Sequence, residues 1–322
     1  MKRCPAVKAA VSGMSALLLL LSTGCGESTE PSKEDRSRTR LESLPDDAVK
    51  MSPADDPYPP ILHAAEWNPP VPLDSTVNTA GAEDSPFIPA DRNELYFFFT
   101  PDVRIPAEKQ ILDGVTGIYL SPSDGNGFGE AKRIWLQDPG KLALDGAEFI
   151  QGNDMWFASA REGYTGIHWF RAVYANGAWN DWMLADFDPA FEVGELHMHG
   201  DALYYHSARS GGNGQFDIWM LERIDGEWRN PQNVAAVNSS EQEGWPYITP
   251  DGEELWFTRF VNGSPAVLRS VKADGGWQPP ELILTQFAGE PTLNSRGDIF
   301  FVHHYYVDGR MIEADIYVSR KR

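Results

Sequence analysis

Seven carboxylates stand at the starts of short apolar runs in this 322-residue chain, and they are the residues best suited to acid–base chemistry. They are Glu83, Asp84, Asp145, Glu148, Glu195, Glu243 and Glu290. Two carboxyl groups that flank a glycosidic bond can hydrolyse it, with about 5 Å between them in retaining enzymes and about 6.5–9.5 Å in inverting ones. Trp245, close to Glu243, offers an aromatic face for a sugar ring. One interpretation is therefore glycoside hydrolysis by Asp84, Asp145, Glu148, Glu195 and Glu243.

The same acids also have a structural interpretation, in which they cap strand starts or face solvent. Similar acids recur from one apolar run to the next, whereas catalysis needs an asymmetric group of residues. We therefore favour a binding protein without catalytic residues and keep hydrolysis as the alternative.

Two histidines alternate in the run from Leu196, which turns His197 and His199 to the same side of an extended strand. With Glu195 they could share a metal ion, but histidines packed and hydrogen-bonded between strands are the commoner case. The chain has no Gly-x-Ser-x-Gly elbow and no Gly-x-x-x-x-Gly-Lys phosphate loop. We therefore predict no metal and no cofactor. The predicted ligand-binding residues are Glu148, Glu195, His197, His199 and Trp245.

Short strands joined by tight turns must position these residues. Between Glu243 and Ile283, alternating apolar runs are separated by Asp251-Gly252, Asn262-Gly263 and Asp274-Gly275. Gly, Asn and Asp tolerate the positive φ of two-residue hairpin turns, so this stretch predicts a four-stranded antiparallel meander.

The meander recurs along the chain, as its second-strand aromatic pair shows. The copies are Tyr96-Phe97, Trp156-Phe157, Tyr204-Tyr205, Trp256-Phe257 and Phe300-Phe301. Units of roughly 40–50 residues with four strands each are typical of propeller blades. We predict an all-β fold, a five-bladed β-propeller of four-stranded antiparallel blades.

A fourth-strand pattern, Trp-x-x-Pro-x-x-aliphatic, predicts how the ring closes. It is clear at Trp228 and Trp277, and a further copy precedes the first unit at Trp67, Pro70 and Leu73, whereas the last unit has none after it. We therefore predict that this N-terminal strand pairs in the last blade, which removes open sheet edges.

Segments of the second and third strands resemble the TolB-type, WD-like propeller repeats. The run from His206 to Gly212, with Asp217-Ile218-Trp219, is similar to that family's Ser-x-Arg-x-Gly-Gly and Asp-Ile-Tyr segments, and Pro250 to Phe257 matches its Pro-Asp-Gly-x-x-Leu-x-Phe segment. The resemblance implies a periplasmic or surface-exposed binding scaffold whose first strands line a central channel. It also implies that the repeated arginines and aspartates are structural.

The N-terminus has the features of a targeting segment. Lys2, Arg3 and Lys8 precede a short apolar run, and small residues precede Cys25. Residues 1–25 resemble a bacterial lipoprotein signal peptide, which implies a lipid anchor at Cys25. Residues 26–58 are polar, acidic and poor in apolar side chains, and they predict a disordered tether. Residues 59–322 are then the propeller domain.

The charge of the chain limits its partners. A formal net charge of -20 argues against nucleic acid, because that ligand needs a basic surface. Cys4 would leave with the signal, and the single cysteine that remains cannot form an internal disulfide. We therefore predict a monomeric, lipid-anchored scaffold in the cell envelope, periplasmic or surface-exposed, which binds a protein or glycan through its channel mouth and loops.

Overall fold

Antiparallel β-meanders make up most of the described chain. The computed structural model describes residues 38–123, 125, 127–188 and 191–322, so the predicted signal peptide and Cys25 lie outside the described residues. Within them, the helices are α1 (Arg40–Ser43) and α2 (Ala107–Gln110), and neither has the length and apolar character needed to cross a membrane.

The strands pair in chain order, as the repeated turns predict. One four-stranded sheet contains β7 (Ala143–Gln151), β8 (Asp154–Arg161), β9 (Ile167–Ala175) and β10 (Ala178–Leu184). Another contains β11 (Leu196–His199), β12 (Ala202–Ser207), β13 (Asp217–Ile224) and β14 (Glu227–Asn233). A six-stranded sheet contains β15 (Glu243–Ile248), β16 (Glu254–Val261), β17 (Ser264–Ala273), β18 (Gly276–Trp277), β19 (Glu281–Thr285) and β1 (Ile61–Leu62).

An eight-stranded sheet brings early and late parts of the chain together. Its late strands are β20 (Ala288–Leu293), β21 (Ile299–Val307) and β22 (Arg310–Ser319). Its early strands are β2 (Val71–Pro72), β3 (Ala82–Phe87), β4 (Glu94–Thr100), β5 (Gly117–Pro122) and β6 (Lys132–Arg133). The predicted N-terminal strand, β2, pairs antiparallel with β22, and Val71 lies opposite Val318. A single parallel bridge between Ala82 and Ala314 joins β3 to β22.

The fourth-strand motif makes the same backbone hydrogen bond in four places. In each, the N–H of the aliphatic residue donates to a carbonyl of the third strand. The pairs are Leu73 with Ile316 (2.9 Å), Ile134 with Ile118 (2.9 Å), Ala185 with Trp169 (2.8 Å) and Val234 with Ile218 (3.0 Å). Trp67 is 1% exposed and packs edge-on against Trp256 of β16. The motif therefore has one structural role along the chain, including at its N-terminal copy.

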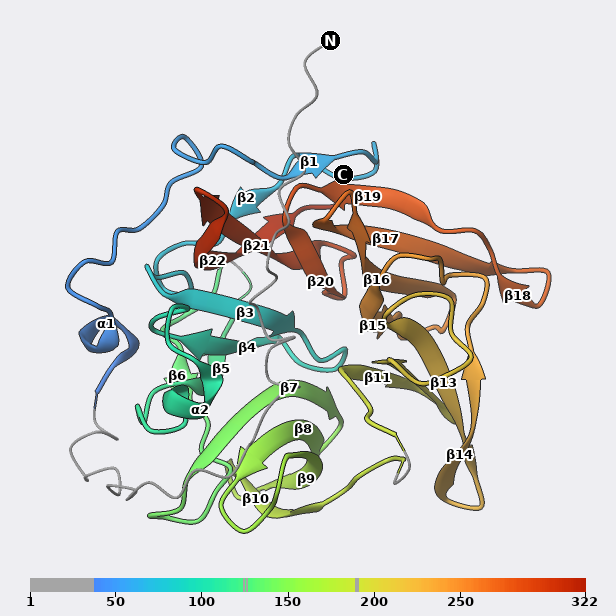
Figure 1. Ribbon diagram of the computed structural model, residues 1–322, viewed down its shortest axis with the longest axis horizontal. Helices are drawn as coiled ribbons and strands as arrows, with labels where there is room; N and C mark the ends of the chain where they lie inside the picture. The colour runs from blue at the N-terminus through green and yellow to red at the C-terminus, as the bar shows by residue number, and fades with distance from the viewer. Residues whose placement is uncertain (1–37, 124, 126, 189–190) are drawn as a thin grey trace.

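The first strands of the meanders, β3, β7, β11, β15 and β20, lie innermost around the centre of the molecule (Figure 1). A one-residue register shift interrupts β3, β7, β15 and β20 at the same place. There Ser85, Ala147, Trp245 and Glu290 have φ values of 48°, 55°, 52° and 54°. Such bulges bend a strand and redirect its side chains, and here they are the repeated device that shapes the centre.

Residues 38–58 differ from the disordered tether that their composition predicts. The Arg40 side chain is buried and donates to Glu83 at 2.9 Å and to the Thr76 carbonyl at 2.8 Å. Lys50 pairs with Glu313 and Asp315 of β22, and Asp56 pairs with His303 of β21 at 2.9 Å. Composition underestimates the order of this segment, because a few charged side chains, each with a buried partner, hold it against the sheets.

Candidate ligand site at the centre of the sheets

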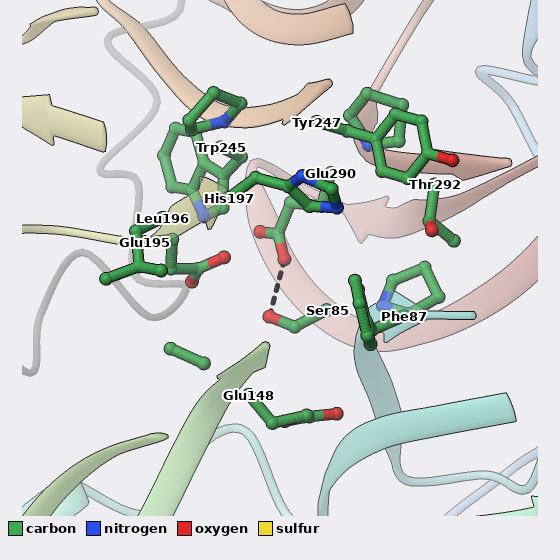
Figure 2. Close-up of a pocket in the computed structure, with 14 residues that line it drawn as sticks. Ser85, Phe87, Glu148, Glu195, Leu196, His197, Trp245, Tyr247, Glu290 and Thr292 are labelled. Atoms are coloured by element: carbon green, nitrogen blue, oxygen red, sulfur yellow. Dashed lines mark hydrogen bonds between the residues drawn. The ribbon is translucent and has the colours of Figure 1, made fainter. Parts of the chain in front are cut away.

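A small cavity lies among the innermost strands at the level of the bulges (Figure 2). Its volume is about 40 Å³, which is large enough to hold water. Its lining comes from all five first strands and the residues beside them, in the segments 85–87, 147–148, 195–197, 245–247 and 290–292.

Four of the seven predicted carboxylates belong to this site. Glu148, Glu195 and Glu290 line the cavity, and Figure 2 shows their side chains around one shared space. The hydroxyl of Ser85 donates to Glu290 at 2.6 Å. Asp84 lies beside Glu290, and one ligand atom each of Asp84, Glu290 and His304 lies within 4.8 Å of the others. The centre is therefore acidic and buried.

Burial changes the ionisation of these carboxylates. It raises the pKa of Glu148 to about 8. Burial also raises the pKa of Glu195, and the charges of Asp84 and Glu148 raise it further. The pKa of Glu290 rises first through burial and then through the charges of Asp84 and Glu195. The site thus holds carboxyl groups that can donate as well as accept a proton near neutral pH.

The other three predicted acids lie in buried ion pairs, so they do not face solvent as the second interpretation allowed. Each is buried beside an arginine outside the cavity lining. The pairs are Glu83 with Arg40 (2.9 Å), Asp145 with Arg161 (2.8 Å) and Glu243 with Arg259 (2.6 Å). Asp145 and Glu243 therefore do not join the carboxylates that the hydrolase alternative would need at one site.

The two predicted histidines have different surroundings. His197 lines the cavity, and its ring centroid lies 4.6 Å from those of Phe149 and Tyr247. Burial lowers its pKa to about 3, so the ring is neutral and acts as part of the wall. His199 lies against the next turn, where a Cβ on Gly252 would meet its ring at 2.6 Å. Among the described residues, the group close enough for a metal is instead Asp84, Glu290 and His304.

The sequence analysis missed three residues that lie at or beside the cavity, namely Ser85, Tyr247 and His304. A departure from the repeat could have marked this region, because Asp84 occupies a position where the other units have glycine. Those residues are Gly146, Gly194, Gly244 and Gly289. At Gly194 there is no space for a side chain, because a Cβ would come within 2.2 Å of the His206 ring. Asp84 therefore differs from the other units in carrying a side chain at this position.

Comparisons with known proteins place the fold. No protein-family model and no curated protein matches the chain. A solved structure of Bacteroides ovatus Xyloglucan PUL GH43B is 12% identical with a TM-score of 0.50, over 77% of this chain and 53% of that chain. An endo-arabinase from Bacteroides thetaiotaomicron is 12% identical with a TM-score of 0.51, over 78% of this chain and 96% of that one. The fold is a β-propeller.

The propeller spans about half the length of the first of these structures, which is 53% covered. TolB from Acinetobacter baumannii also matches, at 13% identity and a TM-score of 0.46 over 77% of this chain and 57% of that one. At such identities the likeness concerns the path of the backbone, so the chemistry of the propeller must be argued from its own central residues.

Proposed function

We propose that this chain is a five-bladed propeller, closed by β2 in the last blade, which binds a glycan at the mouth of its central cavity. The observation that carries the proposal is the group of carboxylates at the centre. Asp84, Glu148, Glu195 and Glu290 come from four different blades, and only Glu195 and Glu290 share a position in the repeat. Buried carboxylates without a basic partner raise the free energy of the folded state, so a role in binding is the reason we give for them.

The chemistry of the cavity wall favours a glycan over a protein partner. Carboxylates accept hydrogen bonds from sugar hydroxyls, and Trp245 and Tyr247 add aromatic surface beside them. The cavity is small, about 40 Å³, so we expect one part of a glycan to enter it. The rest of the glycan would then contact the loops at the mouth.

The location of the protein belongs to the same proposal. The segment before Cys25 supports a lipid anchor at that residue and a position in the cell envelope, where glycans are abundant. Metabolic labelling with a clickable fatty acid should mark the wild-type chain and not the Cys25→Ser variant. Equal labelling of both would remove the anchor from the proposal.

Glycoside hydrolysis is the second candidate, and one observation favours it. Glu148 has a pKa raised to about 8, as a general acid needs, and other carboxylates lie around the same cavity. The small volume counts against it, because hydrolysis needs the scissile bond, and so parts of two rings, between the carboxylates.

A glycan array with the whole chain, carrying Cys25→Ser to prevent lipidation, tests both candidates. We expect retention of a defined set of glycans, weakened at least tenfold by Glu148→Gln or Trp245→Ala and unchanged by Glu253→Gln, an exposed control. Release of reducing ends from a retained glycan would favour hydrolysis. Retention that survives both central variants would refute the central site.

A further inference from the structure

Three potential metal ligands meet where the first and last blades come together. Asp84 lies on β3, Glu290 on β20 and His304 on β21. One ligand atom of each lies within 4.8 Å of the other two, and His304 Nε2 is 3.8 Å from Asp84 Oδ1. The side chain of Asp84 is 7% exposed and that of His304 is 11% exposed. This arrangement is compact, buried and built from elements far apart in the sequence.

A second observation points to a positively charged ligand near these residues. Glu148 is 6% exposed and lines the same cavity as Glu290, yet neither of its carboxylate oxygens has a hydrogen-bond partner. Within the described part of the chain, the ion pairs give Asp84, Glu148 and Glu290 no arginine or lysine, whereas Glu83, Asp145 and Glu243 each have one. A buried carboxylate without a positive partner is costly unless it takes up a proton or binds a metal.

We propose that Asp84, Glu290 and His304 bind one divalent transition-metal ion beside the cavity that Glu148 and Glu290 both line. The donor set combines two carboxylates, which suit Mn²⁺, with one imidazole, which Mg²⁺ and Ca²⁺ rarely take. Around a six-coordinate ion with bonds of about 2.1–2.4 Å, ligand atoms lie about 3–5 Å apart. Tetrahedral zinc would need all separations near 3.4 Å. The donor set therefore favours Mn²⁺, and water or a ligand oxygen would complete the shell.

This ion would link the blade of β3 to the blade of β20 and β21. β3 and β22 pair at one bridge, Ala82 with Ala314, and Ser85 and Ile88 hydrogen-bond to Glu290 and Thr292 of β20, so a shared metal would add a further connection at this contact. Because the metal binds the folded chain and not the unfolded one, it would raise the melting temperature. The inference does not depend on glycan binding and can succeed or fail without it.

Titration of the metal-stripped whole chain, carrying Cys25→Ser, with MnCl₂ tests the site. Electron paramagnetic resonance should show one bound ion per chain, and its pulsed form should show coupling to one imidazole nitrogen. His304→Gln should remove the nitrogen coupling and weaken binding at least tenfold, and Asp84→Asn should weaken it similarly. The matched control is His168→Gln, because His168 pairs with Asp186 at 2.8 Å away from the centre, and it should leave binding unchanged.

Three outcomes would overturn the proposal. They are no saturable site at one equivalent, nitrogen coupling that persists in His304→Gln, and an Mn²⁺ melting-temperature shift equal in the parent and in His304→Gln. Should Asp84→Asn fail to fold, His304→Gln decides alone, since its partly exposed side chain supports less of the core. If Zn²⁺ competes with Mn²⁺ and both need His304, the site stands with a different preferred ion.

Discussion

Two kinds of buried carboxylate lie on the innermost strands, and only one to three residues along the strand separate them. Glu83, Asp145 and Glu243 hold arginines and stabilise individual blades. Asp84 and Glu148 are close to the first two in sequence and lie at the bulges, but Glu148 lines the cavity and Asp84 lies beside Glu290. A single residue of offset along a strand moves a side chain from one face to the other, so neighbouring acids acquire different roles.

The centre should make the stability of the fold depend on pH through Glu148. Its pKa rises from 4.5 to about 8 on burial, so the folded chain keeps a proton that the unfolded chain loses between these values. The free energy of unfolding must therefore fall as pH rises through that window, by at most about 1.4 kcal/mol per unit. The Glu148→Gln substitution removes this pH-dependent contribution to the free energy of unfolding.

We expect the melting temperature of Glu148→Gln, relative to the parent, to increase steadily from pH 5 to pH 8. His197, whose pKa is lowered to about 3, acts with the opposite sign below pH 6.5, but it is present in both chains and cancels in the difference. Glu253→Gln, at an exposed position, should show no such trend. A difference that does not vary with pH would contradict the buried-acid assignment.

Arg40 should be among the most sensitive positions outside the cavity. Its guanidinium bonds to Glu83, which is fully buried, and lies over the rings of Phe97 and Phe99. Arg40→Met leaves that carboxylate without a cation and should lower the free energy of unfolding by about 3–5 kcal/mol. Chemical denaturation measures this loss. Arg38→Met, at an exposed site, should cost little, and adding Glu83→Gln to Arg40→Met should restore part of the loss.

At the scale of elements, the sequence predicted the strands because their signals are local. Gly turns, alternating apolar residues and the Trp-x-x-Pro-x-x-aliphatic motif are read within about ten residues, and the N-terminal copy at Trp67 to Leu73 does pair with β22. The docking of residues 38–58 was missed because it depends on distant partners, such as Asp315 for Lys50 and His303 for Asp56. Likewise, no local pattern tells which acids the bulges turn inward.

The β2 segment gives a prediction at the same scale. Trp67 is 1% exposed, packs on Trp256 and donates its indole N–H to the Gly297 carbonyl. Trp67→Ala should therefore cost about 3–5 kcal/mol of unfolding free energy. Val71→Ala, on the same segment but 50% exposed, should cost less than about 1 kcal/mol. Denaturant titration would measure the unfolding free energy of both variants. A loss for Trp67→Ala as small as that for Val71→Ala would mean that this segment contributes little to the stability of the last sheet.

For the whole molecule, residues 38–58 act as a strap across the first and last blades. Blades with β8 and β16 supply the arginine for their own inner acid, Arg161 and Arg259. The blade of β3 receives Arg40 from the strap instead, and the blade of β22 receives Lys50. The strap thus provides positive charges that these two blades lack, so the folded unit begins before residue 59.

Truncation should reveal this dependence. A chain that begins at residue 59 buries Glu83, Glu313 and Asp315 without the cations they have in the full chain, whereas a chain that begins at residue 38 keeps them. We expect the shorter chain to melt at least 10 °C lower or to fail to fold, since breaking one buried ion pair alone costs about 3–5 kcal/mol. The chain that begins at residue 38 should have the same melting temperature as the chain that begins at residue 26. Equal melting temperatures for all three would show that the strap adds no stability, and the inner acids of the first and last blades would then need another source of compensation.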